Sequence, residues 1–128
     1  MPLLAAAAFT AVLAALAVFQ VALVAGAPLG HFAWGGKDRV LPREKRTGSV
    51  VAVVLYALFA LLGLERVAAI DLLPAGADTF VRIAMWVVAA YLALGILMNL
   101  ASRSRPERYV MAPIAAVLAA LGVVLALA

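Results

Sequence analysis

Residues 2–27, PLLAAAAFTAVLAALAVFQVALVAGA, decide the fold, because this long apolar stretch contains no charged side chain. A helix needs about 20 mostly apolar residues to cross the roughly 30 Å hydrocarbon core of a bilayer. Three more segments of this kind follow, at about residues 47–64, 79–101 and 109–128. Since backbone groups cannot remain unpaired in lipid, all four segments should be helices. The sequence therefore predicts an all-α, polytopic membrane four-helix bundle, with residues 1–128 forming a single domain.

The overall composition supports this prediction. Hydrophobic residues make up 69% of the 128 residues and charged residues only 12%, whereas soluble domains are close to half apolar and a quarter charged. A water-soluble protein with so few charges could not cover its surface. The connections between the predicted spans are also too short to hold a folded domain.

The basic residues are unequally divided between the two ends of the predicted bundle. Eight of the ten Lys and Arg residues lie in or beside the first and third connections: Lys37, Arg39, Arg43, Lys45, Arg46, Arg103, Arg105 and Arg108. Short loops rich in Lys and Arg stay in the cytoplasm. Together with an Ala- and Val-rich composition typical of GC-rich bacterial genomes, this indicates a bacterial cytoplasmic (inner) membrane protein with both termini extracytoplasmic. Such loops also favour contact with membrane lipid, particularly anionic lipid.

An alternative interpretation makes the first segment a cleaved signal peptide, because Ala25-Gly26-Ala27 resembles a small-residue cleavage site. The segment lacks a positively charged n-region, and its apolar stretch is too long for a signal peptide. A retained membrane span is therefore the preferred interpretation.

Small residues recur at helical spacing in every predicted span, where they would let helices approach closely. The sets are Ala7, Ala11 and Ala15; Ser49, Ala52, Tyr56, Ala60 and Gly63; Tyr91, Gly95 and Asn99; and Ala112, Ala116 and Ala120. We expect these sets, and Gly95 and Ala116 in particular, to face other helices.

Two side-chain amides, Gln20 and Asn99, lie in the half of the spans nearest the basic loops. An unpaired amide is costly in an apolar medium, so both should face the bundle, either as interhelical hydrogen-bonding partners or as part of a ligand-binding pocket with Tyr91. Pro113 should displace the Tyr109 carbonyl and bend the last helix. We therefore predict a small polar cavity bordered by Gln20, Asn99 and that carbonyl.

The connections contain the remaining candidate residues. Trp34 suits the membrane interface, and His31 is expected to be a hydrogen-bonding surface residue. Arg46 could pair with Glu107 across the two basic loops, as could Arg103. Glu107 and Ser104 also have the spacing of a capping box at the start of the last helix, and Asp78 is the expected N-cap of the third.

Several classes of chemistry are unlikely on composition alone. The chain has no cysteine and a single histidine, which leaves no expectation of a metal site or a cofactor. No nucleophile and base occur in a recognisable pair, so no catalytic residue is assigned. Without a folded basic surface, nucleic-acid binding is not expected.

Two groups of short motifs resemble a family of small uncharacterised bacterial four-helix membrane proteins. The first group contains Gln20, Gly26-Ala27-Pro28-Leu29-Gly30, Gly35-Gly36, Leu41-Pro42 and Arg46, and the second contains Asn99-Leu100, Ser102, Ser104, Glu107-Arg108 and Pro113. This family often has a glutamate where this chain has His31. The resemblance implies a fold and a membrane location, and no substrate.

Three functions remain open from the sequence. The preferred one is a non-enzymatic accessory or interaction subunit, with a membrane protein partner or a homo-oligomer. The alternative is a small oligomeric channel or carrier with a polar pathway near Gln20 and Asn99. A lipid-modifying enzyme would require His31, Glu107 and the loop arginines to converge. The first helix has no acid, so it lacks the membrane-embedded ionisable group that usually marks a proton-coupled pathway.

Overall fold

The computed structural model describes residues 2–128, and within that range its regular structure is entirely helical. The long helices are α1 (Pro2–Val24), α2 (Arg43–Arg66), α3 (Asp78–Ala101) and α4 (Ala112–Leu127), and a π-helical turn, η3 (Glu107–Met111), leads directly into α4. Two one-turn 3-10 segments, η1 (Gly30–Phe32) and η2 (Trp34–Gly36), lie between α1 and α2. When η3 is counted with α4, all four helices are long and apolar enough to cross a membrane. The predicted four-helix membrane bundle is confirmed.

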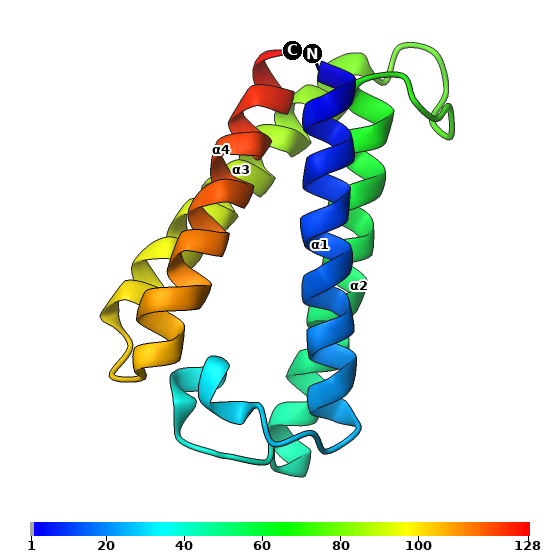
Figure 1. The fold of residues 1–128 in the computed structure, drawn as a ribbon. Helices are drawn as coiled ribbons and strands as arrows, with labels where there is room; N and C mark the ends of the chain where they lie inside the picture. The colour runs from blue at the N-terminus through cyan, green and yellow to red at the C-terminus, as the bar shows by residue number, and fades with distance from the viewer. Residues whose placement is uncertain (1) are drawn as a thin grey trace.

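The bundle consists of two antiparallel helix pairs. Helix α1 packs along α2 and α3 along α4, whereas the contacts between the two pairs are fewer. Figure 1 shows that the pairs are close together at the end that carries both termini and move apart toward the other end. The α1–α2 connection lies across the wide end of this gap.

The apolar core occupies the part of the bundle where the pairs are close. It contains Ala6, Phe9, Leu13 and Leu16 of α1, Phe59 of α2, Met85, Val88 and Leu92 of α3, and Leu118, Ala119, Leu125 and Ala126 of α4. The close approach between helices depends on two glycines. A Cβ atom at Gly122 would lie 3.5 Å from the Ala89 Cα, and one at Gly63 would lie 3.1 Å from the Phe9 ring.

The small-residue prediction is confirmed for α2, where Ser49 and Gly63 are buried and the other members of the set, Ala52, Tyr56 and Ala60, are partly buried. It is wrong for most of α1 and α4, because Ala7, Ala11, Ala15, Ala116 and Ala120 are exposed. Larger side chains on those helices fill the space between the pairs instead. Gly95 also does not touch another helix, since a Cβ atom built there would meet no atom within 4 Å.

Polar groups close the end of the bundle near the termini. The Glu65 carboxylate accepts hydrogen bonds from the backbone N–H groups of Leu72 and Leu73, at 2.9 and 3.1 Å. Arg66 donates to the carbonyl oxygens of Ala126, at 3.3 Å, and Ala128. These contacts hold the α2–α3 connection and the end of α4 against α2.

Two predicted helix caps differ from the observed ones. Helix α3 begins at Asp78 itself, with Ala77 as its N-cap and no side-chain capping bond. At η3, the Glu107 N–H donates to Ser104 Oγ over a long 3.5 Å, while the Glu107 carboxylate accepts from Ser102 Oγ at 2.8 Å. Only half of the predicted capping box therefore forms, because the Glu107 carboxylate accepts from Ser102 Oγ and the Ser104 N–H donates to Ser102 Oγ instead of to Glu107.

Candidate functional site

The separation of the helix pairs leaves a groove that is lined mainly by α3, faces α2 across the gap between the pairs, and is completed inside by η3, α4 and one residue of α1. Its inner part has a volume of about 180 Å³ and is lined by Leu16, Ala52, Tyr56, Tyr91, Leu92, Leu94, Gly95, Met98, Asn99, Met111, Ile114, Ala115 and Leu118. Its outer part, about 760 Å³, is lined by Trp34, Gly35, Lys45, Gly95, Met98, Asn99, Ala101, Ser102, Arg103 and Glu107. Because both parts share Gly95, Met98 and Asn99, they form one continuous space, which we call the α2–α3 groove.

The groove exists because α3 presents the face that carries Tyr91, Gly95 and Asn99 to the gap between the pairs. Gly95 has no side chain to fill the space beside it. Tyr91 is half exposed and forms an edge-to-face contact with Phe59, with ring centroids 5.6 Å apart. Phe59 belongs to the buried core, so this aromatic pair marks the place where the groove meets the core.

The predicted site residues are only partly brought together. Asn99 and Tyr91 both line the groove, as the sequence indicated. Gln20 faces the bundle as predicted, being only 7% exposed, but it does not line the groove. It lies instead beside Tyr56, close enough to interact with the tyrosine hydroxyl group, and its Oε1 atom has no hydrogen-bond partner within residues 2–128.

Neither Gln20 nor Tyr109 lines either part of the groove, so the cavity predicted between Gln20, Asn99 and the Tyr109 carbonyl is not the groove that Asn99 lines. Tyr56, and not Gln20, lines the inner part of the groove together with Asn99. The π-helical turn η3 comes directly before the segment containing Pro113. A π turn inserts an extra residue into the helix, which accommodates the proline without opening the bundle at Tyr109.

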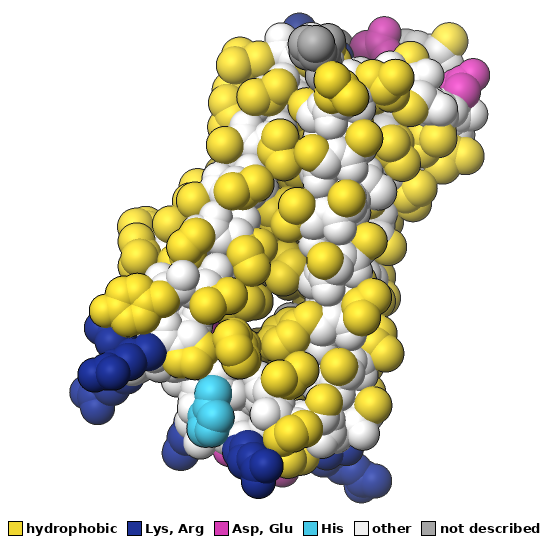
Figure 2. Space-filling view, in the orientation of Figure 1, with side chains coloured by type: hydrophobic (Ala, Val, Ile, Leu, Met, Phe, Trp, Pro, Cys, Tyr) yellow, Lys and Arg dark blue, Asp and Glu magenta, His cyan; other side chains and the backbone are white. Residues whose placement is uncertain are grey.

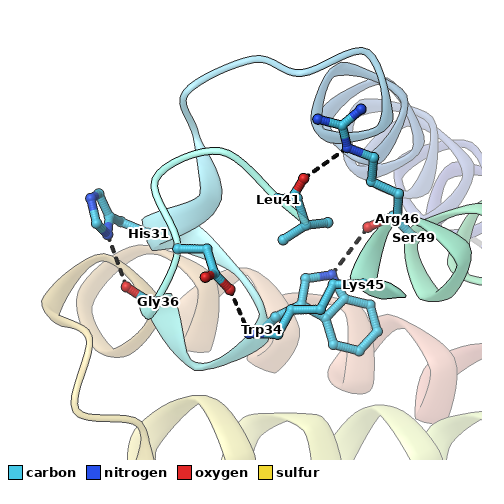
Figure 3. A network of polar contacts seen from close by, with 8 residues as sticks. His31, Trp34, Gly36, Leu41, Lys45, Arg46 and Ser49 are labelled. Atoms are coloured by element: carbon cyan, nitrogen blue, oxygen red, sulfur yellow. Dashed lines mark hydrogen bonds and ion pairs between the residues drawn. The ribbon is translucent and has the colours of Figure 1, made fainter. Parts of the chain in front are cut away.

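Trp34 stands at the mouth of the groove, at the end rich in basic residues. Its indole N–H donates to the buried Ser49 Oγ at 3.1 Å (Figure 3). The ring lies against Gly48 of α2. The backbone at Trp34 has a φ of 53°, followed by 82° at Gly35 and 72° at Gly36, a left-handed turn that residues without a Cβ adopt most easily. This turn aims the indole ring at α2.

His31 and Arg46 stabilise the loop that carries Trp34. The His31 Nδ1 atom lies 2.8 Å from the Gly36 carbonyl oxygen, and Arg46 Nε donates to the Leu41 carbonyl oxygen at 2.7 Å (Figure 3). The His31 carbonyl oxygen accepts from Ser104 Oγ at 2.5 Å, which joins the two basic loops. As predicted, His31 is an exposed surface residue that takes part in hydrogen bonds.

Glu107 does not form the ion pair with Arg46 or Arg103 that the sequence indicated. It is buried, with 7% of its surface exposed, and its carboxylate accepts from Ser102. Within residues 2–128 the ion pair joins Lys45 Nζ to Asp38 Oδ2 at 2.5 Å. The charge at the mouth of the groove is therefore set by this pair, by Glu107 and by the exposed Arg103.

The sequence missed four residues that define the groove as a site. Tyr56 and Ser49 were assigned to a packing face, and Lys45 and Arg103 were assigned to the basic connections. The signal in the sequence was the presence of two polar side chains, Ser49 and Tyr56, on one face of α2, together with the basic residues Lys45 and Arg103 in the connections.

Metal-ligating side chains do not gather in the described part of the chain. Residues 2–128 contain no cluster of three or more His, Cys, Asp or Glu side chains that could hold a metal ion.

No protein-family model matches the chain, and comparisons with curated proteins and with solved structures find no significant match either.

Proposed function

We propose that the protein is a non-enzymatic accessory subunit of the membrane that binds another membrane component in the α2–α3 groove. The groove carries this proposal, because helices of a small bundle ordinarily fill the space between them. Here the space stays open beside Gly95 and is lined by Tyr91 and Asn99. Concave, mostly apolar surfaces with a few polar groups are typical of binding sites.

A binding role is better supported than an enzymatic one. The His31 ring is turned toward the Gly36 carbonyl, while the Glu107 carboxylate is bound to Ser102. These two groups therefore interact with their own loops: the His31 Nδ1 atom meets a backbone carbonyl rather than a hydroxyl group, and the Ser102 hydroxyl that Glu107 binds also accepts from the Ser104 N–H, a contact that stabilises the turn before α4.

The channel or carrier alternative has less support. Asn99 and the two tyrosines give the groove polar groups, but Phe9, Met85, Leu118 and Leu125 fill the bundle toward the termini. A continuous pathway would require an oligomer, with a lining from more than one copy.

The distribution of charge supports a bacterial cytoplasmic membrane as the location, with both termini extracytoplasmic. In Figure 2 the Lys and Arg side chains gather at the end opposite the termini. The positive-inside rule places that end in the cytoplasm, so the mouth of the groove would open on the cytoplasmic side.

Site-specific photo-crosslinking tests the binding role. A benzophenone amino acid is introduced at Leu94, an exposed residue that lines the groove, or at Val18, an exposed residue of α1 outside it. In native membranes, Leu94 should give a discrete adduct that Val18 does not give. The adduct mass distinguishes a lipid, another protein and a second copy of this chain.

Identical labelling at the two positions would contradict the proposal, because both side chains would then be meeting bulk lipid. A discrete adduct from Val18 alone would move the binding surface to α1 and also reject the groove.

A further inference from the structure

The groove has the depth of one bilayer leaflet. Tyr91 and Asn99 lie eight residues apart on α3, which corresponds to about 12 Å at a helical rise of 1.5 Å per residue. Half of the hydrocarbon core is about 15 Å thick. Helix α3 ends at Ala101, so the groove runs from the membrane surface at the basic end to a point near the bilayer midplane.

The lining changes character along this depth. Between Tyr91 and Met98 the walls are mostly apolar, and Leu16 of α1 and Ile114 and Leu118 of α4 also line this part. Asn99 follows at the start of the outer part, where it lines the groove together with Ser102 and Arg103. Because Asn99 lies two residues before the end of α3, at the boundary between the apolar lining and the basic end, its amide can donate to a polar group held at the membrane surface.

The mouth adds positive charge beyond this amide. Lys45 is neutralised in part by Asp38, whereas Arg103 is exposed and forms no ion pair within the described chain. The two basic loops and adjoining helix ends carry eight basic and three acidic side chains, a net charge of +5. The buried Glu107 carboxylate also lines the mouth and adds a negative charge there, while its Oε1 accepts a hydrogen bond from Ser102, so the excess of positive charge comes from the surrounding basic loops.

The groove passes from an apolar lining to the Asn99 amide and then to a basic mouth. From this sequence of linings we infer that the groove binds one anionic phospholipid, taken from the leaflet that faces the basic loops. One acyl chain lies between Tyr56 and Tyr91 beside Gly95, the Asn99 amide donates to an ester carbonyl oxygen, and Arg103 faces the phosphate group. This inference rests on the proposed function, since it identifies the component that the groove binds.

Native mass spectrometry of the purified full chain tests the inference. The protein is released from vesicles that contain equal amounts of dioleoyl phosphatidylglycerol and dioleoyl phosphatidylcholine. The wild-type chain should retain one lipid, with phosphatidylglycerol preferred. Gly95→Leu should abolish this adduct, because the new side chain enters the groove where nothing lies within 4 Å of its Cβ atom. Ala93→Leu is the matched control, since Ala93 is exposed on α3 outside the groove and should leave the adduct unchanged.

Two charge variants separate head-group recognition from chain insertion. Arg103→Gln should reduce the preference for phosphatidylglycerol about fivefold, the effect expected for one basic residue beside anionic lipid, while still permitting a lipid adduct. Asp38→Asn should increase the preference, because it frees Lys45 from its ion pair. A gain of binding cannot result from misfolding, and thermal unfolding of each variant in detergent checks that the bundle is intact.

The inference is rejected if the wild-type chain retains the two lipids equally, or if folded Gly95→Leu keeps the adduct. If Leu94 crosslinks a protein while no phosphatidylglycerol is retained, the lipid inference fails and the proposed function stands. If neither a crosslink nor a lipid adduct is found, both fail.

Discussion

The indole ring of Trp34 rests directly on the backbone of Gly48, so closely that a Cβ atom at residue 48 would lie 2.6 Å from the ring. The hydrogen bond to Ser49 Oγ holds the same ring from a second direction. The left-handed backbone at Trp34 costs free energy for a residue with a side chain, and these two contacts offset that cost. The loop at the mouth of the groove is thus attached to α2 through one aromatic side chain.

We expect Gly48→Ala to displace this ring, because 2.6 Å is far below the usual carbon–carbon contact distance of about 3.5–4.0 Å. In a Trp86→Phe background, the fluorescence emission of Trp34 should shift to longer wavelength as the ring moves into water. Ser49→Ala removes only the hydrogen bond and should give a smaller shift. Unchanged emission in Gly48→Ala would show that the ring does not pack on residue 48.

Gly95→Ala should stabilise the bundle, in contrast to Gly48→Ala, although both glycines lie within helices. The added Cβ atom meets nothing within 4 Å, and alanine in a helix interior is favoured over glycine by about 0.5–1 kcal/mol. We therefore expect the free energy of unfolding in detergent to increase by that amount. A decrease would mean that Gly95 packs against another helix, as its spacing in the sequence suggested.

Gly122→Leu should destabilise the bundle strongly, because a Cβ atom there already contacts Ala89 at 3.5 Å. Overpacking of a close contact typically costs about 1–3 kcal/mol. Ala116→Leu adds a comparable side chain on an exposed face of α4 and should change stability by less than about 0.5 kcal/mol. Thermal unfolding of the two variants compares them directly, and equal losses would contradict the observed helix packing.

Arg66→Gln should loosen the end of α4. Arg66 donates to the carbonyl oxygens of Ala126 and Ala128, and a hydrogen bond of this kind contributes about 1 kcal/mol. Hydrogen exchange should become faster at the last turn of α4 while the centre of the helix keeps its protection. Arg82→Gln is the control, since Arg82 is exposed on α3. If the two variants exchange at the same rate, the Arg66 contacts do not stabilise the helix end.

The topology is tested with a reporter that is active only in the cytoplasm. Fused after Ala128 it should give no signal, because eight of the ten basic residues lie at the opposite end of the bundle. The same reporter inserted after Arg105 should be active. The reverse result would invert the orientation and place the mouth of the groove outside the cell.

The fold could be predicted because the bilayer sets the length of each span, and apolar segments of that length are visible in the sequence. The helix ends were harder to predict. Helix α2 begins at Arg43, ahead of its apolar segment, since charged residues can continue a helix beyond the hydrocarbon core where hydropathy gives no signal.

The candidate site could be predicted only in part, because spacing along one helix shows which residues share a face and not which helix that face meets. Tyr91, Gly95 and Asn99 were correctly placed on one face of α3. Gln20 is buried in the bundle, but Tyr56 of α2, and not Gln20, lines the groove. The face of α1 that lies in the core carries large side chains such as Phe9, which the alanine spacing in α1 did not reveal.

The arrangement in two helix pairs has a consequence for how the chain assembles. Each pair is a hairpin with most of its contacts inside itself, so residues 2–66 and 78–127 are expected to insert into the bilayer as two separate units that dock afterwards. The link between Ser104 and the His31 carbonyl joins these units at their far ends. Two fragments divided near Gly76, an exposed position in the connection between them, should therefore recombine into the native bundle when they are produced in the same cell.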